Sequence, residues 1–64
     1  MDYTNSQIAA VIDEVIHSER DRKLLKRRYI DGIHFEALAE EFDMSVRHCK
    51  RVIYTQSEKL FKHL

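Results

Sequence analysis

The stretch "DGIHFEALAEEFDMSVRHCKRVIY", residues 31–54, holds two helix patterns separated by three residues that break both. The first pattern is acidic, and the second is basic from its first turn. Between them lie Asp43, a residue type that tolerates a left-handed backbone, then Met44, and then Ser45, which is a favoured N-cap. The stretch therefore predicts two closely joined helices, over residues 35–42 and 46–63.

Two further helices are predicted upstream. Thr4 and Gln7 have the spacing of a capping box, and an apolar stripe then recurs at steps of three and four residues, formed by Ile8, Val11, Ile12, Val15 and Ile16. Ser18 is a cap for a second helix that ends at the left-handed stop of Gly32. These signals predict helices over 5–17 and 19–31. With no proline and no alternating strand pattern, the chain is expected to be all-α, a single four-helix domain over residues 1–64.

Length and composition narrow the class of protein. A domain of 64 residues buries only roughly 60% of its unfolded surface, so oligomerisation would add stability. A single cysteine, Cys49, excludes an internal disulfide and fits a reducing compartment. No apolar run has the length of a membrane span, and the first residues, "MDYTNSQ", lack the features of a signal peptide. We therefore expect a cytoplasmic protein without a membrane association.

Charge is balanced overall but segregated along the chain. Eleven Lys and Arg residues face eleven Asp and Glu residues. Residues 1–19 carry four acids and no Lys or Arg, and residues 33–44 again carry four acids and no Lys or Arg. Residues 20–32 carry six bases and two acids, and residues 45–64 carry five bases and one acid. A zero net charge argues against a general nucleic-acid coat, but a merely solvated surface does not require this segregation.

Helical periodicity predicts the core and one buried charge. The second helix is expected to bury Leu24, Leu25 and Tyr29. Arg28 lies in the same arc, so its charged end must either extend outward to solvent or find a partner, which Glu36 or Glu40 could supply. In the last helix one arc holds the predicted buried seam, namely Val46, Cys49, Ile53, Leu60 and Leu64.

Polar and basic residues dominate the rest of the last helix, most of them in its first turns. A short helix, a tight turn and a second helix of this kind form the layout of a helix-turn-helix, whose second helix enters the major groove of duplex DNA. Arg or Lys there can donate to guanine O6 and N7. The predicted DNA contacts are Arg47, His48, Lys50, Arg51, Tyr54 and Thr55, with weaker backbone contacts from Arg20, Lys23 and Arg27.

Residues 19–60 carry a family resemblance. "RYIDG" at 28–32 looks like an Arg-Tyr followed by a glycine stop, "FEALAEEF" at 35–42 like an aromatic-Glu-x-apolar-Ala-Glu helix, and "MSVRHCKRVI" at 44–53 like the opening of a recognition helix. Together they resemble region four of bacterial sigma factors and the small phage or prophage regulators built on it. Asp43, His34 and Cys49 depart from the family's usual turn glycine, Ser or Thr cap, and β-branched core residue.

The resemblance implies DNA binding through the helix that contains Arg47 to Tyr54, and members of this family can also bind RNA polymerase. No core-promoter-binding region precedes residue 19, so a complete sigma factor is not expected. Residues 1–18 instead supply an additional helix whose aliphatic stripe suits a homodimer interface, together with the C-terminal helix.

Catalytic and metal chemistry are not expected. Four histidines and Cys49 invite a metal site, but His48 and Cys49 are adjacent and diverge by ~100° on a helix, and no HxxxH or CxxC pair exists. Carboxylates without a pocket and the absence of a glycine-rich phosphate loop argue against an enzyme and against a cofactor.

The hypothesis is a phage-type or mobile-element-derived transcriptional regulator. The alternative is a protein-interaction module on the same fold that binds RNA polymerase or another host nucleic-acid enzyme, as activator or inhibitor. A plain structural bundle is the third possibility.

Overall fold

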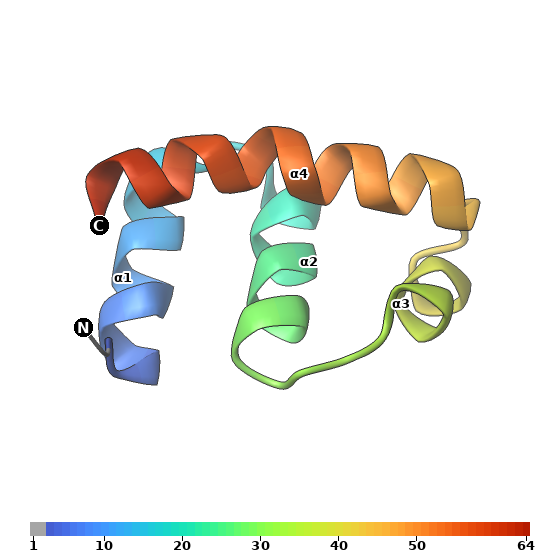
Figure 1. Ribbon diagram of the computed structural model, residues 1–64, viewed down its shortest axis with the longest axis horizontal. Coiled ribbons are helices and arrows are strands. Elements are labelled where there is room, and N and C mark those ends of the chain that lie inside the picture. The colour runs from blue at the N-terminus through green and yellow to red at the C-terminus, as the bar shows by residue number, and fades with distance from the viewer. Residues whose placement is uncertain (1–2) are drawn as a thin grey trace.

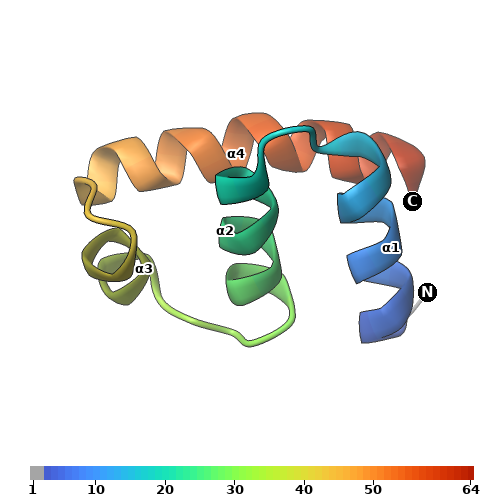
Figure 2. The same ribbon diagram turned by 180° about the vertical axis from the view of Figure 1, so that it is seen from behind.

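The computed structural model describes residues 3–64, and all regular structure in this range is helical. The four helices are α1 (Asn5–Val15), α2 (Glu19–Tyr29), α3 (Phe35–Glu41) and α4 (Val46–His63). In Figure 1, α1 and α2 stand side by side beneath the long α4, and α3 lies under the N-terminal end of α4. Seen from behind in Figure 2, α4 passes across the far side of the other helices. The predicted all-α, four-helix class is confirmed.

Side-chain caps begin three of the helices at the predicted residues. Thr4 and Gln7 form the capping box of α1, the Ser18 hydroxyl accepts from the backbone N–H of Asp21, and Ser45 accepts from that of His48. The fourth cap differs, because His34 precedes α3 without a side-chain capping bond. Only α4 has the bounds predicted for it.

The other helices end earlier than predicted because the chain has to turn. Ile16 is extended, with φ −102° and ψ 117°, and this conformation directs its side chain into the core; α1 therefore ends at Val15. Gly32 has φ 70°, as predicted, but α2 already ends at Tyr29. Asp43 has φ 54°, the predicted left-handed residue between α3 and α4. The Met44 N–H then donates to the Ala39 carbonyl at 2.8 Å, which closes the turn.

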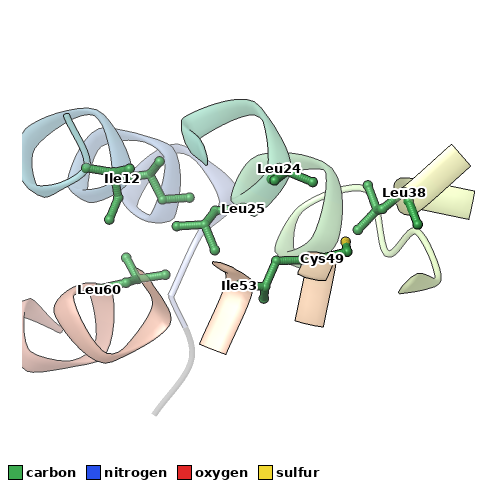
Figure 3. Packing of buried hydrophobic residues seen from close by; sticks show 9 residues of the cluster. Ile12, Leu24, Leu25, Leu38, Cys49, Ile53 and Leu60 are labelled. Atoms are coloured by element: carbon green, nitrogen blue, oxygen red, sulfur yellow. The ribbon is translucent and has the colours of Figure 1, made fainter. Parts of the chain in front are cut away.

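One apolar core joins all four helices. Its buried members are Ile12, Ile16, Leu24, Leu25, Leu38, Ala39, Cys49, Ile53 and Leu60. Figure 3 shows Ile12 and Leu60 at one end, Leu38 and Cys49 at the other, and Leu24, Leu25 and Ile53 between them. The predicted seam of α4 is confirmed at Cys49, Ile53 and Leu60, which are at most 1% exposed.

The aliphatic stripe of α1 packs inside its own chain. Ile12 is fully buried, and Ile8, Val11 and Val15 are half-buried against the same core. This packing uses the surface that was expected to join two copies, so α1 offers little aliphatic area for a dimer. Within residues 3–64 no helix combines the length and the hydropathy needed to cross a membrane.

Two polar side chains are also buried in the described chain. Asp21 is 6% exposed and Ser57 is 5% exposed. Asp21 accepts hydrogen bonds from the Arg20 guanidinium at 3.0 and 3.1 Å and from the Gln56 amide at 2.7 Å. The Ser57 and Tyr29 hydroxyls lie 2.6 Å apart. These bonds tie α2 to α4 and replace the water that each buried group has lost.

Candidate nucleic-acid interface

The first turns of α4 present the predicted contact residues to solvent. Arg47, His48, Lys50, Arg51, Tyr54 and Thr55 are all exposed. The Ser45 cap fixes the first turn of α4, and the buried seam of Cys49 and Ile53 fixes the rotation of the helix about its axis. These polar and basic groups therefore line one side of a rigid helix, with their charged ends in water.

The basic residues of α2, in contrast, are held by the protein itself. Arg22 donates to the Ile16 carbonyl and Arg28 to the Ile33 carbonyl. The remaining four form ion pairs, which are Arg20–Asp21, Lys23–Glu19, Lys26–Asp13, and Arg27 with both Asp31 and Glu41. The high positive charge of α2 that the sequence displays is therefore largely neutralised in the fold.

Arg27 is the most strongly engaged of these side chains. Its guanidinium donates to Glu41 at 2.8 and 3.1 Å and to Asp31 at 3.0 Å. The hydrogen bond from its guanidinium to Glu41 is the largest cause of a raised pKa of Arg27, followed by the hydrogen bond to Asp31. A phosphate at Arg27 would compete with two carboxylates, and Arg20 and Lys23 face similar competition from Asp21 and Glu19.

The bases of α4 have no such partners. Among residues 3–64, no ion pair involves Arg47, Lys50, Arg51, Lys59 or Lys62. Lys50 instead points toward an aromatic ring, with Nζ 5.6 Å from the centroid of Phe35. Within residues 3–64, the bases of α4 thus have no acidic partner, whereas four of the six bases of α2 do.

Arg28 adopts a different environment from the one predicted. Neither Glu36 nor Glu40 pairs with it; its Nη1 donates to the Ile33 carbonyl at 3.1 Å, and its guanidinium carbon lies 4.4 Å from the Phe35 ring centroid. Phe35 also meets Tyr54 edge-on, with the ring centroids 5.9 Å apart. The α2–α3 loop explains the difference, because it brings a carbonyl and an aromatic face to Arg28 while both Glu36 and Glu40 stay in solvent.

The helix next to these basic residues is acidic. Glu36, Glu40 and Asp43 are exposed on α3 and in the turn that follows it. In a helix-turn-helix complex the first helix crosses the DNA backbone, and carboxylates there are repelled by phosphates. Any DNA on α4 must therefore approach from the side away from these three acids.

Open grooves on the described surface include one near the C-terminal end of α4 and one beside α2. One of about 380 Å³ lies between α1 and the end of α4, and its lining includes His17, His63 and Lys59. The other, of about 270 Å³, is lined by Lys23, Lys26, Arg27, Glu41 and Phe42. Residues 3–64 contain no group of three or more His, Cys, Asp or Glu side chains arranged to hold a metal ion. Cys49 is buried, and this burial raises the pKa of its thiol.

The chain was compared with protein families, curated proteins and solved structures. No family model, curated protein or solved structure matches it. Residue-by-residue chemistry is therefore the basis for assigning a function. Sequence reasoning placed Phe61 in the terminal core or in a dimer interface and gave Phe35 no contact role. The i, i+7 spacing of Tyr54 and Phe61 was the available signal that two aromatic rings share one side of α4.

Proposed function

We propose that this protein is a small DNA-binding transcriptional regulator that uses α3 and α4 as a helix-turn-helix. The observation that carries the proposal is the pairing of charges: α2 bases are bound internally, whereas the exposed bases in the first turns of α4 have no acidic partner within residues 3–64. Free cations on a rigid, exposed helix are the groups that contact base edges and phosphates.

Each contact residue has a role in this proposal. Arg47 and Arg51 donate to guanine O6 and N7 or to phosphates, and Lys50 binds a phosphate at the edge of the site. His48, Tyr54 and Thr55 supply shorter polar contacts beside them. Arg20, Lys23 and Arg27 contribute little, because acids already hold them. The regulator works in the cytoplasm and derives from a phage or another mobile element.

A mobility-shift titration tests the assignment, with the DNA upstream of the protein's own gene as probe and a random duplex as competitor. Arg51→Ala should weaken specific binding by about 1–3 kcal/mol, or roughly tenfold to a hundredfold. Lys62→Ala is the matched control, since Lys62 is also exposed on α4 but lies in its last turn. If both variants lost the same DNA affinity, the loss would reflect only the change in net charge. If Arg51→Ala lost no affinity, its role as a DNA contact would be contradicted.

A protein-interaction module that binds RNA polymerase or another host nucleic-acid enzyme remains the second candidate. The exposed carboxylates of α3 beside α4, and a net charge of zero, favour it. The two candidates separate by salt dependence. DNA affinity should fall steeply between low and physiological salt, with a log–log slope of about −0.9 for each phosphate contacted, whereas the interaction module would select no DNA site and would form a stable protein complex.

Dimerisation is part of the proposal because paired half-sites suit a two-fold protein. The aliphatic stripe of α1 is occupied by the core, so α1 contributes less to a dimer interface than its sequence pattern predicts. Sedimentation equilibrium with and without the specific duplex measures whether one copy or two bind per site.

A further inference from the structure

Two aromatic pairs lie along one flank of α4 and are here called the aromatic face, which consists of Tyr29, Phe35, Tyr54 and Phe61. Tyr54 meets Phe35 edge-on at 5.9 Å, and Phe61 meets Tyr29 edge-on at 5.7 Å. Ser57, which lies between Tyr54 and Phe61 on the same flank of α4, is 2.6 Å from the Tyr29 hydroxyl. The two aromatic pairs are therefore neighbours, and they span α2, α3 and α4.

Tyr54 and Phe61, on α4, are the more exposed residues of the aromatic face. Tyr54 and Phe61 are each 57% exposed, and they are the large hydrophobic residues of the described chain that remain on the surface. They lie two helical turns apart, or about 10 Å along the axis. Their inner partners hold them in fixed positions, so little side-chain entropy is lost when a second protein covers them. Rigid, half-exposed aromatic rings of this kind commonly supply most of the binding energy at protein interfaces.

Three bases lie near the Phe35 end of the aromatic face, where Glu36 of α3 is also exposed. Arg28 and Lys50 both lie over the Phe35 ring, and Arg47 lies two turns before Tyr54 on the same flank of α4. None of the three forms an ion pair within residues 3–64. Glu58 is the one acid on α4. The aromatic face is thus apolar in its middle and cationic at one end.

We propose that the aromatic face docks an acidic amphipathic helix of a partner protein, laid along α4. Aliphatic residues of that helix cover Tyr54 and Phe61, and its carboxylates meet Arg28, Lys50 and Arg47. Helices recognise such surfaces through residues at i, i+3, i+4 and i+7, which matches the two-turn separation of the exposed rings. The proposed surface shares Tyr54, Lys50 and Arg47 with the proposed DNA contacts, so a partner helix and duplex DNA compete for them. Phe61, Tyr29 and Arg28 lie outside those contacts.

Two other occupants fit less well. A second copy of this chain that used its own aromatic face would bring a second cationic end to the contact, and Glu58 is the one acid on α4. Single-stranded nucleic acid stacks its bases on open ring faces, whereas the Phe35 ring is already contacted by Arg28 and Lys50.

Nuclear magnetic resonance with two synthetic helical peptides tests the proposal on the unmodified protein. Both peptides, about 18 residues long to match five turns, carry leucine at i, i+3, i+4 and i+7. One has glutamate on the flanks and the other has lysine. The glutamate peptide should shift the amide signals of residues around Tyr54, Phe61 and Arg28, and the lysine peptide should bind at least tenfold more weakly.

Variants then separate the aromatic face from the DNA surface. Phe61→Ser should weaken the glutamate peptide about tenfold or more, corresponding to about 1.4 kcal/mol, and leave duplex binding unchanged, while Phe61→Tyr keeps the ring and should retain peptide binding. Arg51→Ala should do the reverse of Phe61→Ser. Four results would each overturn the proposal. They are equal binding of both peptides, shifts confined to another surface, tighter binding of oligothymidylate at the same residues, and self-association that Phe61→Ser abolishes.

Discussion

Asp43 bears the most constrained backbone of any non-glycine residue in residues 3–64. Its φ of 54° lies in the left-handed region, which costs most L-residues roughly 1–2 kcal/mol and costs Asp somewhat less. Asp43→Val should therefore lower the free energy of unfolding by about 1–2 kcal/mol, and Asp43→Gly should leave it equal or slightly higher. Urea unfolding of the three proteins measures the difference. A Val variant as stable as the parent would mean that the turn adopts another conformation.

Burial of Cys49 makes the stability of the fold depend on pH. Burial raises the pKa of its thiol, so the folded protein keeps the proton at pH values where the unfolded chain, with an ordinary thiol ionising near pH 8.5, begins to lose it. The stability associated with this thiol is intact below about pH 8.5 and is lost as the pH rises through the folded value. Urea midpoints between pH 7 and pH 10 should fall more for the parent than for Cys49→Ala. Parallel curves would contradict the effect.

Individual residues differ in how far the sequence predicts their surroundings. Thr4, Ser18 and Ser45 act as caps in the structure because capping depends on atoms within three residues. The partner of Arg28 was predicted wrongly, since it depends on the path of the α2–α3 loop. Asp21 reads as an ordinary first-turn acid, and only its contact with Gln56, distant in sequence, shows why it is buried.

The Asp21–Gln56 contact gives a prediction about that burial. Asp21→Ala removes the acceptor of the Gln56 amide and of Arg20, and Gln56 already has a buried oxygen without a partner in the described chain. Loss of a hydrogen-bonded buried charge should lower the free energy of unfolding by about 1.5–3 kcal/mol. Thermal unfolding checks this, with Glu14→Ala, an exposed acid, as the control expected to change little.

Among the elements, α4 begins at a side-chain N-cap supplied by Ser45. The Ser45 hydroxyl accepts from the His48 N–H at 3.1 Å. Ser45→Ala should lower the free energy of unfolding by about 1 kcal/mol, and Ser45→Asp should restore it because aspartate also caps and favours the positive end of the helix dipole. Helical circular dichroism during urea titration compares them. An aspartate variant no better than alanine would rule out capping as the cause.

The elements also mark where sequence patterns lose precision. Amphipathic spacing predicts that a helix exists, and α4 has the bounds expected for it because a cap precedes it and the apolar seam runs through its length. The ends of α1, α2 and α3 come one or two residues earlier than expected, where the chain bends to bring Ile16 and Phe42 against the core. Tertiary packing determines where these three helices end, and the residues near each end do not reveal that packing.

At the scale of the molecule, one core contacts every helix, so no helix is expected to unfold independently of the others. Ile12 from α1 and Ile53 from α4 belong to the same buried cluster. Ile12→Val should lower the free energy of unfolding by about 0.5–1.5 kcal/mol and shift a single transition. Far-ultraviolet circular dichroism and tyrosine fluorescence should report the same midpoint. A separate early transition for α1 would contradict a single cooperative core.

The distribution of free charge is also a property of the whole molecule. The sequence reveals that α2 is rich in bases, but not that Asp13 from α1 and Glu41 from α3 neutralise two of them. The composition of the candidate DNA surface on α4 could be predicted from helical periodicity. Its distinction from α2 could not, because ion pairing depends on which helices become neighbours.

The hydrogen bond from the Tyr3 hydroxyl to the Leu64 carbonyl, 2.6 Å long, brings the two ends of the described chain together. Both ends lie beside α1, away from α3 and the first turns of α4 (Figures 1 and 2). A short glycine-serine linker can therefore join residues 3 and 64 into a closed ring without crossing α3 or the first turns of α4. A ring of this kind has fewer unfolded conformations, which makes circularisation a direct route to a more heat-resistant form of this fold.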